Sequence, residues 1–158
     1  MARLRAILSL VFVAALAVAV QACGPNQEDV GLIRLWTDDY EIRMKPDVIP
    51  PRALEQITYT ITVYDKETRE PIANGEGQLF ATNADRKTVW NGLEYGPEPG
   101  TYRAKIMFIT AGEWAMGFRF RRDSTQALQR TDDWRQQVRN EVVPSGAPTN
   151  APPGGGSN

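Results

Sequence analysis

The stretch that decides the fold is residues 57–65, Ile57-Thr58-Tyr59-Thr60-Ile61-Thr62-Val63-Tyr64-Asp65. Isoleucine, tyrosine or valine occupies every second position, and threonine or tyrosine fills the positions between them. Side chains alternate between the two faces of a β-strand, and β-branched and aromatic residues favour strands. The stretch therefore predicts a strand with one face in a hydrophobic core.

Shorter segments of similar character lie on both sides of this strand. Their apolar residues predict strands in segments 32–36, 40–44, 78–82, 88–90 and 93–95. Turn-forming residues separate them, and Asn91-Gly92 predicts one such turn. Short strands about ten residues apart are typical of antiparallel β-sandwiches. We expect a mainly β chain, with an immunoglobulin-like antiparallel β-sandwich over residues 30–123.

The longest alternation of apolar and polar residues runs through segments 102–108 and 114–120. The apolar positions are Tyr102, Ala104, Ile106, Phe108, Trp114, Met116, Phe118 and Phe120. A connection that contains Gly112 separates the two segments, so they predict a long β-hairpin with one apolar face. Met107 falls on the other face, whereas Met116 and Met44 are expected in the core.

The pattern changes after residue 123. Apolar residues and a threonine recur three or four positions apart at Leu128, Thr131, Trp134, Val138 and Val142. This spacing predicts an amphipathic helix within residues 124–143, and a solvated tail is the alternative. Residues 144–158 contain only Pro, Ser, Gly, Ala, Thr and Asn, a composition that predicts a disordered tail.

The N-terminal segment has the features of an export signal. Arg3 and Arg5 precede an apolar run over residues 6–20, which is shorter than the roughly 20 residues that span a bilayer. The run ends at Val20-Gln21-Ala22-Cys23, which resembles the lipobox of bacterial lipoproteins. The resemblance implies that residues 1–22 are a removed signal peptide and that Cys23 carries a diacylglycerol and an acyl chain such as palmitate. Residues 23–29 then comprise the lipidated cysteine and a spacer.

An ordinary signal peptide that precedes a free cysteine is the alternative for this segment. Under the lipoprotein interpretation, the chain is anchored by its lipid in the cell envelope, on the extracytoplasmic side. Gly24, rather than aspartate, then favours the periplasmic face of the outer membrane in a cell that has one.

Composition narrows the class of protein. Histidine is absent and Cys23 is the only cysteine, which excludes an intramolecular disulfide, Ser-His-Asp and Cys-His nucleophiles and the common zinc sites. The formal net charge of −1 comes without blocks of like charge, which argues against nucleic-acid binding. We expect no enzymatic activity, no nucleic-acid partner and no cofactor beyond the covalent lipid on Cys23.

The order of several segments resembles the YtkA-like and FixH-like extracytoplasmic domains over residues 38–122. The matching pieces are residues 40–51, 57–65, Glu70-Pro71-Ile72-Ala73-Asn74-Gly75, Gly100-Thr101-Tyr102 and Gly112-Glu113-Trp114. The resemblance implies a small immunoglobulin-like sandwich outside the cytoplasm, in a family often linked to copper handling or cytochrome oxidase assembly. Family members with a metal role carry Met and His in a loop that corresponds here to residues 82–87, which contain neither.

One group of charged residues is a candidate interaction surface. Arg119, Arg121 and Arg122 form a basic cluster that could meet an anionic partner or lipid headgroups, and a basic face that protects a strand edge is the alternative. Asp38-Asp39 is more typical of a solvated turn than of a calcium site. We therefore expect no catalytic and no metal-binding residues.

These observations predict a lipid-anchored extracytoplasmic protein with a small binding or assembly accessory domain. Its expected partners are membrane lipid, through Cys23, and a membrane or periplasmic protein. A copper-handling or cytochrome oxidase assembly factor is the first alternative function. A structural component of the envelope is the second.

Overall fold

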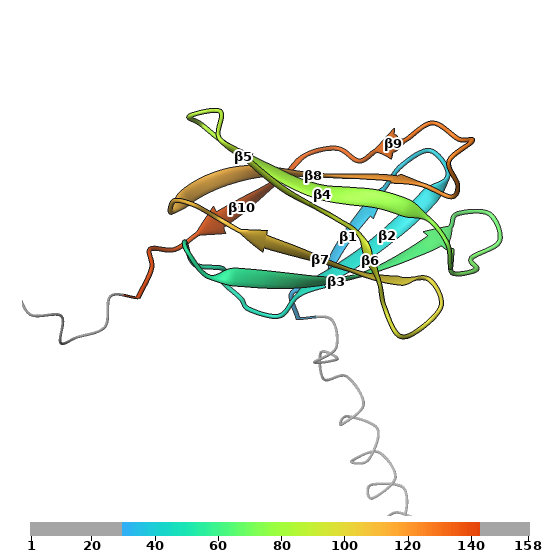
Figure 1. The fold of residues 1–158 in the computed structure, drawn as a ribbon, viewed down its shortest axis with the longest axis horizontal. Helices are drawn as coiled ribbons and strands as arrows, with labels where there is room; N and C mark the ends of the chain where they lie inside the picture. Colours follow the sequence, from blue (N-terminus) through green and yellow to red (C-terminus); the bar gives the residue numbers. More distant parts are fainter. Residues whose placement is uncertain (1–29, 143–158) are drawn as a thin grey trace, which may run out of the picture. The chain divides into compact units, whose positions relative to one another are not determined.

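The computed structural model describes residues 30–142 as an all-β fold of two antiparallel five-stranded sheets packed together (Figure 1). The predicted β-sandwich is thus confirmed, and no helix occurs in this part of the chain. The predicted signal peptide (1–22), the Cys23 spacer segment (23–29) and the predicted disordered tail (144–158) lie outside the described residues.

The first sheet is built around the strand that the sequence marks most strongly, β3. Its strand order is β1 (Ile33–Trp36), β2 (Tyr40–Pro46), β3 (Gln56–Asp65), β7 (Thr101–Met107) and β6 (Glu94–Tyr95). In β3 the side chains of Ile57, Tyr59, Ile61 and Val63 are fully buried, as the alternation predicts. Ile61 pairs with Met44 on one side and with Tyr102 on the other, so the inward row continues across the sheet.

The second sheet is centred on β8 and β4. Its strand order is β10 (Trp134–Val138), β8 (Gly112–Arg121), β4 (Glu76–Asn83) and β5 (Thr88–Gly92), and β9 (Gln129–Arg130) also pairs with β8. The turn predicted at Asn91-Gly92 is wrong, because both residues belong to β5 and pair with β4.

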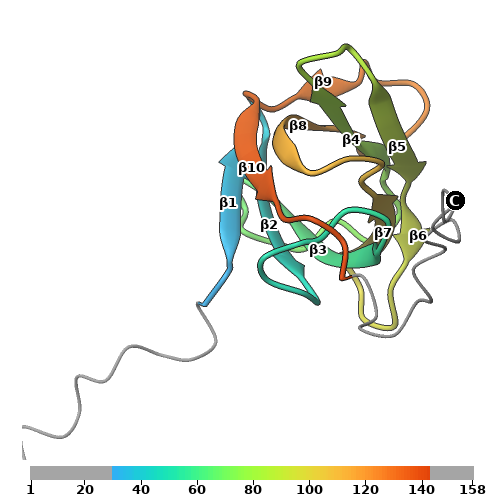
Figure 2. The ribbon, with the colours of Figure 1, turned by 90° about the vertical axis from the view of Figure 1, so that its left-hand side faces the viewer.

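The strands of the two sheets surround one core (Figure 2), and aromatic side chains from both sheets form its centre. The Tyr102 and Phe120 ring centroids lie 5.6 Å apart, and those of Phe108 and Trp114 lie 5.3 Å apart, both in edge-to-face contact. Each pair joins β7 or its C-terminal extension to β8, so these contacts hold the two sheets together. Met44 and Met116 are buried in this core, as predicted.

The predicted hairpin of segments 102–108 and 114–120 is wrong. β7 pairs with β3 and β6, whereas β8 pairs with β4, β9 and β10. Residues 108–111 carry the chain from one sheet to the other. Both strands have an apolar face because they lie on opposite sides of one core, and this arrangement produces the same alternation as a hairpin.

The helix predicted within residues 124–143 is also wrong. This segment forms β9 and β10, which pair with β8 through residues such as Trp134 with Met116 and Val138 with Gly112. Positions four apart share a face in a helix and also in a strand, so the spacing of Trp134 and Val138 fits both. Hydrogen bonding to the backbone of β8 selects the strand. The sandwich therefore extends to Val138 rather than ending at residue 123.

Candidate functional site

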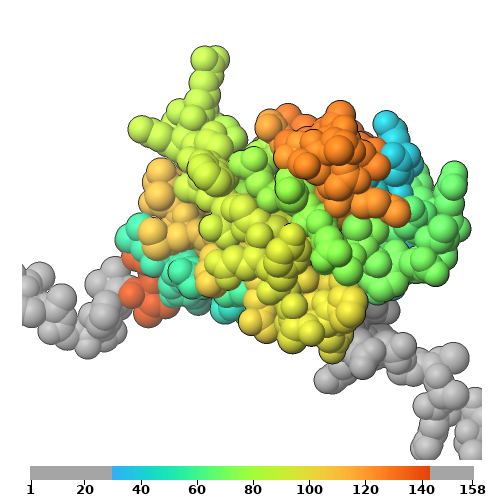
Figure 3. Space-filling model, turned by 45° about the vertical axis from the view of Figure 1, so that its right-hand side comes forward, coloured from blue at the N-terminus to red at the C-terminus, as the bar shows by residue number. Residues whose placement is uncertain are grey.

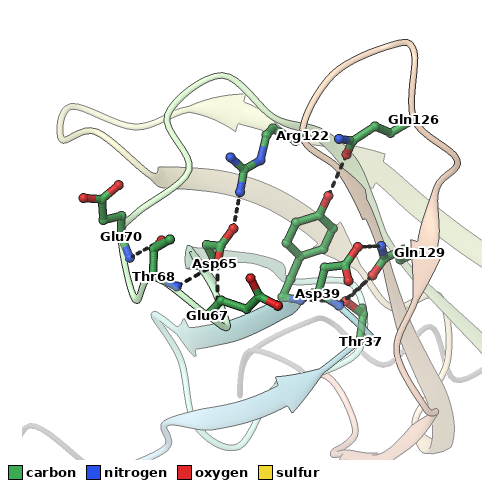
Figure 4. Close-up of polar contacts among 10 residues, drawn as sticks. Thr37, Asp39, Asp65, Glu67, Thr68, Glu70, Arg122, Gln126 and Gln129 are labelled. Atoms are coloured by element: carbon green, nitrogen blue, oxygen red, sulfur yellow. Dashed lines mark hydrogen bonds and ion pairs between the residues drawn. The ribbon is translucent and has the colours of Figure 1, made fainter.

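Three connections meet at one end of the sandwich, where their polar side chains contact one another (Figure 4). They are residues 37–39 between β1 and β2, residues 65–71 after β3, and residues 122–128 between β8 and β9. We call them the polar loop cluster. Its members come from distant parts of the sequence, so folding alone brings them together.

Asp65 organises the loop of residues 65–71. Its Oδ1 accepts hydrogen bonds of 2.9 Å from the backbone N–H groups of Glu67 and Thr68, and its Oδ2 pairs with Arg122. The bond from Thr68 N–H, helped by Glu67 N–H and by Arg122, holds the pKa of Asp65 below its usual range. The carboxylate therefore fixes both its own turn and the start of the β8–β9 connection.

Two glutamines, one in β9 and one in the connection before it, bind the β1–β2 turn and the first residue of β2. Gln129 Oε1 accepts hydrogen bonds from Thr37 Oγ1 at 2.7 Å and from Asp39 N–H at 3.1 Å. The Tyr40 hydroxyl donates to Gln126 Oε1 at 3.0 Å. These contacts span about 90 positions of sequence, and they give the polar loop cluster a defined shape.

The cluster encloses two shallow hollows that share a wall. One, of about 330 Å³, is lined by residues that include Asp38, Asp39, Glu67 and Gln126. The other, of about 230 Å³, lies against residues 68–74. Asp65 and Arg122 line both hollows, so their ion pair forms the shared wall.

The ionisable groups of this end are mainly carboxylates in their charged form. A general acid or base needs a pKa near the working pH, whereas the resolved shifts at this end, of Asp65 and Asp123, are downward. Within residues 30–142, no three Asp, Glu, His or Cys side chains lie close enough together to hold a metal ion. The hollows offer carboxylates and amide groups to a polar or cationic partner.

The three arginines of the predicted basic cluster have different partners. Arg119 lies 5.1 Å from the centre of the Phe80 ring on the outer face of the second sheet. Arg121 pairs with Glu76 at 2.6 Å, and Arg122 pairs with Asp65 in the polar loop cluster. Carboxylates thus pair with two of the three arginines. Cys23, the predicted lipidation site, lies outside the described residues.

Sequence reasoning missed the partners of these arginines. Arg130 stacks on the same Phe80 ring as Arg119, with its guanidinium 5.0 Å from the ring centre.

Glu41 is buried although charged, because Arg43 Nε lies 2.8 Å from one of its oxygens and Arg69 pairs with the other. The hydrogen bond from Arg43 lowers the pKa of Glu41 more strongly than burial raises it. The alternation of β2 places Glu41 outward and carries no signal of this burial.

Comparison with known proteins finds no matching family, no matching curated protein and no matching solved structure. Among residues 30–142, no helix is long and apolar enough to cross a membrane.

Proposed function

We propose that this chain is a bacterial lipoprotein, held at the extracytoplasmic side of a membrane through a lipid on Cys23. The observation that carries the proposal is Val20-Gln21-Ala22-Cys23 at the end of an apolar run. A cysteine thiolate is the nucleophile that such an alkylation needs. Several acyl chains on one residue exceed what stable anchoring requires, and Gly24 favours the periplasmic face of the outer membrane.

We further propose that the sandwich is immunoglobulin-like. The order β2-β3-β7-β6 in one sheet and β10-β8-β4-β5 in the other corresponds to strands A-B-E-D and G-F-C-C′ of that fold. In this correspondence β1 is an additional edge strand and β10 supplies strand G. The chain lacks the inter-sheet disulfide of antibody domains, because it has one cysteine, and Trp114 lies on strand F rather than C.

The proposed role of the domain is non-enzymatic binding or assembly of a membrane or periplasmic protein. The polar loop cluster supports this role because its side chains are fixed by hydrogen bonds before any partner arrives, which lowers the entropic cost of binding. The cluster also lies at the C-terminal end of β1, because residues 37–39 follow this strand. The proposed anchor, Cys23, precedes the strand. A partner could therefore reach it while the lipid stays in the bilayer.

Cell fractionation of a Cys23→Ala variant tests the anchor. The wild type should incorporate labelled palmitate and sediment with membranes, whereas Cys23→Ala should take up no label and lose its membrane association. Gly24→Asp is the matched control, because it keeps the thiol and should keep the label. Retention of Cys23→Ala in the membrane fraction would contradict the proposal.

The same membranes, solubilised in detergent, test the binding role. Affinity purification of the lipidated chain should recover one protein in fixed proportion, and charge reversal by Asp39→Lys with Glu67→Lys should reduce its recovery. Recovery of no stoichiometric partner would favour a structural envelope component instead.

A further inference from the structure

Four exposed apolar side chains lie in two loops at the end of the sandwich opposite to the polar loop cluster. Val48, Ile49 and Leu54 of the β2–β3 loop are 39%, 54% and 58% exposed, and Ile109 of the β7–β8 connection is 41% exposed. We call these four residues the apolar tip. In Figure 3 the turquoise, gold and red atoms of this end lie next to one another. Soluble surfaces usually scatter such side chains singly, so a group of them marks an interaction site.

Backbone contacts hold the tip together. The Leu54 N–H donates to the Phe108 carbonyl at 2.8 Å, which places Leu54 beside Ile109. The neighbouring Ala53 N–H donates to the Arg139 carbonyl at 2.9 Å. The Ile49 side chain lies against Gly31. A Cβ atom added to Gly31 would lie 2.0 Å from the Cδ1 atom of Ile49. The tip therefore lies where the chain enters β1.

Leu54 adopts an unfavourable backbone conformation to point outward. Its φ is +62°, in the left-handed region that bulky side chains rarely occupy. Asparagine or glycine would fit this conformation better, yet the position holds an exposed leucine. Strain of this kind persists where the surrounding structure enforces it, and it clusters at functional positions.

The length of chain before β1 says which surface the tip can reach. Only residues 24–30 separate Cys23 from Gly31, and a fully extended chain of that length spans at most roughly 30 Å at about 3.6 Å per residue. A lipid on Cys23 therefore keeps the sandwich near the bilayer. The tip is the end of the sandwich next to this tether.

Charge also distinguishes the two ends. The loops of the tip carry Arg52 and Arg139 against Asp47, Glu55 and Glu141, so they are close to neutral. At the opposite end carboxylates clearly outnumber basic groups: Asp38, Asp39, Asp65, Glu67, Glu70, Glu98 and Asp123 against Lys66, Arg69 and Arg122. Anionic headgroups repel the acidic end and tolerate the neutral tip.

From these observations we propose that the apolar tip inserts into the interfacial layer of the phospholipid bilayer that holds the lipid anchor. Loops with exposed apolar side chains can enter this layer to a depth of about 5–10 Å, as interfacial helices do. The insertion orients the sandwich, with the polar loop cluster facing away from the membrane. The inference rests on the lipoprotein function proposed above.

The test uses the full lipidated chain in phosphatidylcholine and phosphatidylglycerol vesicles. Ile49→Cys, Leu54→Cys and Leu128→Cys each add one thiol, which is the only reactive one when Cys23 carries lipid. Leu128 is the matched control, because it is 47% exposed and lies in the polar loop cluster. A membrane-impermeant thiol reagent should react at least about tenfold more slowly at positions 49 and 54 than at position 128 on the same vesicles, because burial of the remaining apolar side chains of the tip favours the inserted state by at least this factor.

Salt separates insertion from electrostatic adsorption. The outward face of the first sheet carries Arg34, Arg43, Lys45, Arg103 and Lys105 on neighbouring strands, and this face could instead lie on anionic lipid. Protection at positions 49 and 54 should persist at about 1 M salt, where charges act over only about 3 Å. Loss of protection at high salt would overturn insertion in favour of this basic face.

A second variant changes the apolar character of the tip without a thiol at position 54. Leu54→Asn suits the left-handed backbone, so it should unfold at the same or a higher temperature than the wild type, while the Ile49→Cys thiol in the same loop becomes more reactive in vesicles. Equal reactivity at positions 49, 54 and 128 on vesicle-bound chain would overturn the tip proposal alone. A free Cys23 thiol on chain that does not bind vesicles would overturn the lipoprotein proposal as well.

Discussion

Single charged side chains decide how the loops at the polar end are shaped. Asp65 accepts two backbone N–H groups of its own turn and the guanidinium of Arg122, which is distant in sequence. Each contact favours the ionised carboxylate, so the pKa of Asp65 lies lower in the folded chain than in the unfolded one. The folded state is thus linked to the charge of this residue.

The sign of this linkage gives a prediction for acid unfolding. A carboxyl group with a depressed pKa stabilises the fold fully above its unfolded value, near pH 4, and this contribution disappears as pH falls through the folded value. In Asp65→Asn the loss of unfolding free energy from about pH 5 to pH 2 should therefore be smaller than in wild type. Urea unfolding at several pH values measures it.

Asp85→Asn is the control for this measurement, because Asp85 is exposed in the β4–β5 loop. It should leave the pH dependence close to that of wild type. Identical pH dependence for Asp65→Asn and wild type would show that the Asp65 contacts do not stabilise the fold.

At the scale of elements, β10 is the strand that completes the second sheet. It pairs with residues 112–116 of β8 and buries Val138. The residue after it, Arg139, exchanges backbone hydrogen bonds with Pro51 and Ala53 of the β2–β3 loop. Without this strand, the edge of β8 and part of the core would be exposed to solvent.

Two truncated chains distinguish the contribution of β10 to stability from that of the sequence after it. Ending the chain after Asp133 should lower unfolding free energy by at least about 3 kcal/mol, since it removes the buried Val138 and half-buried Trp134. Ending it after Val143 should leave the melting temperature unchanged. Thermal unfolding followed by circular dichroism measures both, and equal melting of the two truncated chains would contradict the role assigned to β10.

At the scale of the whole molecule, the two sheets are joined by aromatic contacts across the core. Trp114 is fully buried, contacts the Phe108 ring and donates a hydrogen bond from Nε1 to the Thr110 carbonyl at 3.0 Å. It therefore links β8 to the segment that crosses between the sheets, and its loss should weaken the packing of one sheet on the other.

Trp114→Ala should accordingly cost about 3–5 kcal/mol of unfolding free energy, measured by chemical denaturation. Trp90→Ala is the matched control, because Trp90 is 65% exposed on β5. Its cost should stay within about 0.5 kcal/mol. Similar costs for the two variants would contradict the described core.

The sequence alone determines which side chains face the core in most strands. Ile57, Tyr59, Trp114 and Phe118 all fall on predicted inward positions and are all buried, because alternation follows from the local geometry of a strand. The candidate lipidation site rests likewise on a local pattern around Cys23. Such features need no knowledge of distant contacts.

Only the tertiary structure decides which strands pair and which charges meet. Alternation shows that β7 and β8 each have an inward face, but not that they belong to different sheets. The spacing of Trp134 and Val138 fits a helix or a strand, and hydrogen bonding to β8 selects the strand. Arg121 and Arg122 meet Glu76 and Asp65 over 45 and 57 positions of sequence. Pairings of this range depend on the packing of the whole chain, which no local pattern contains.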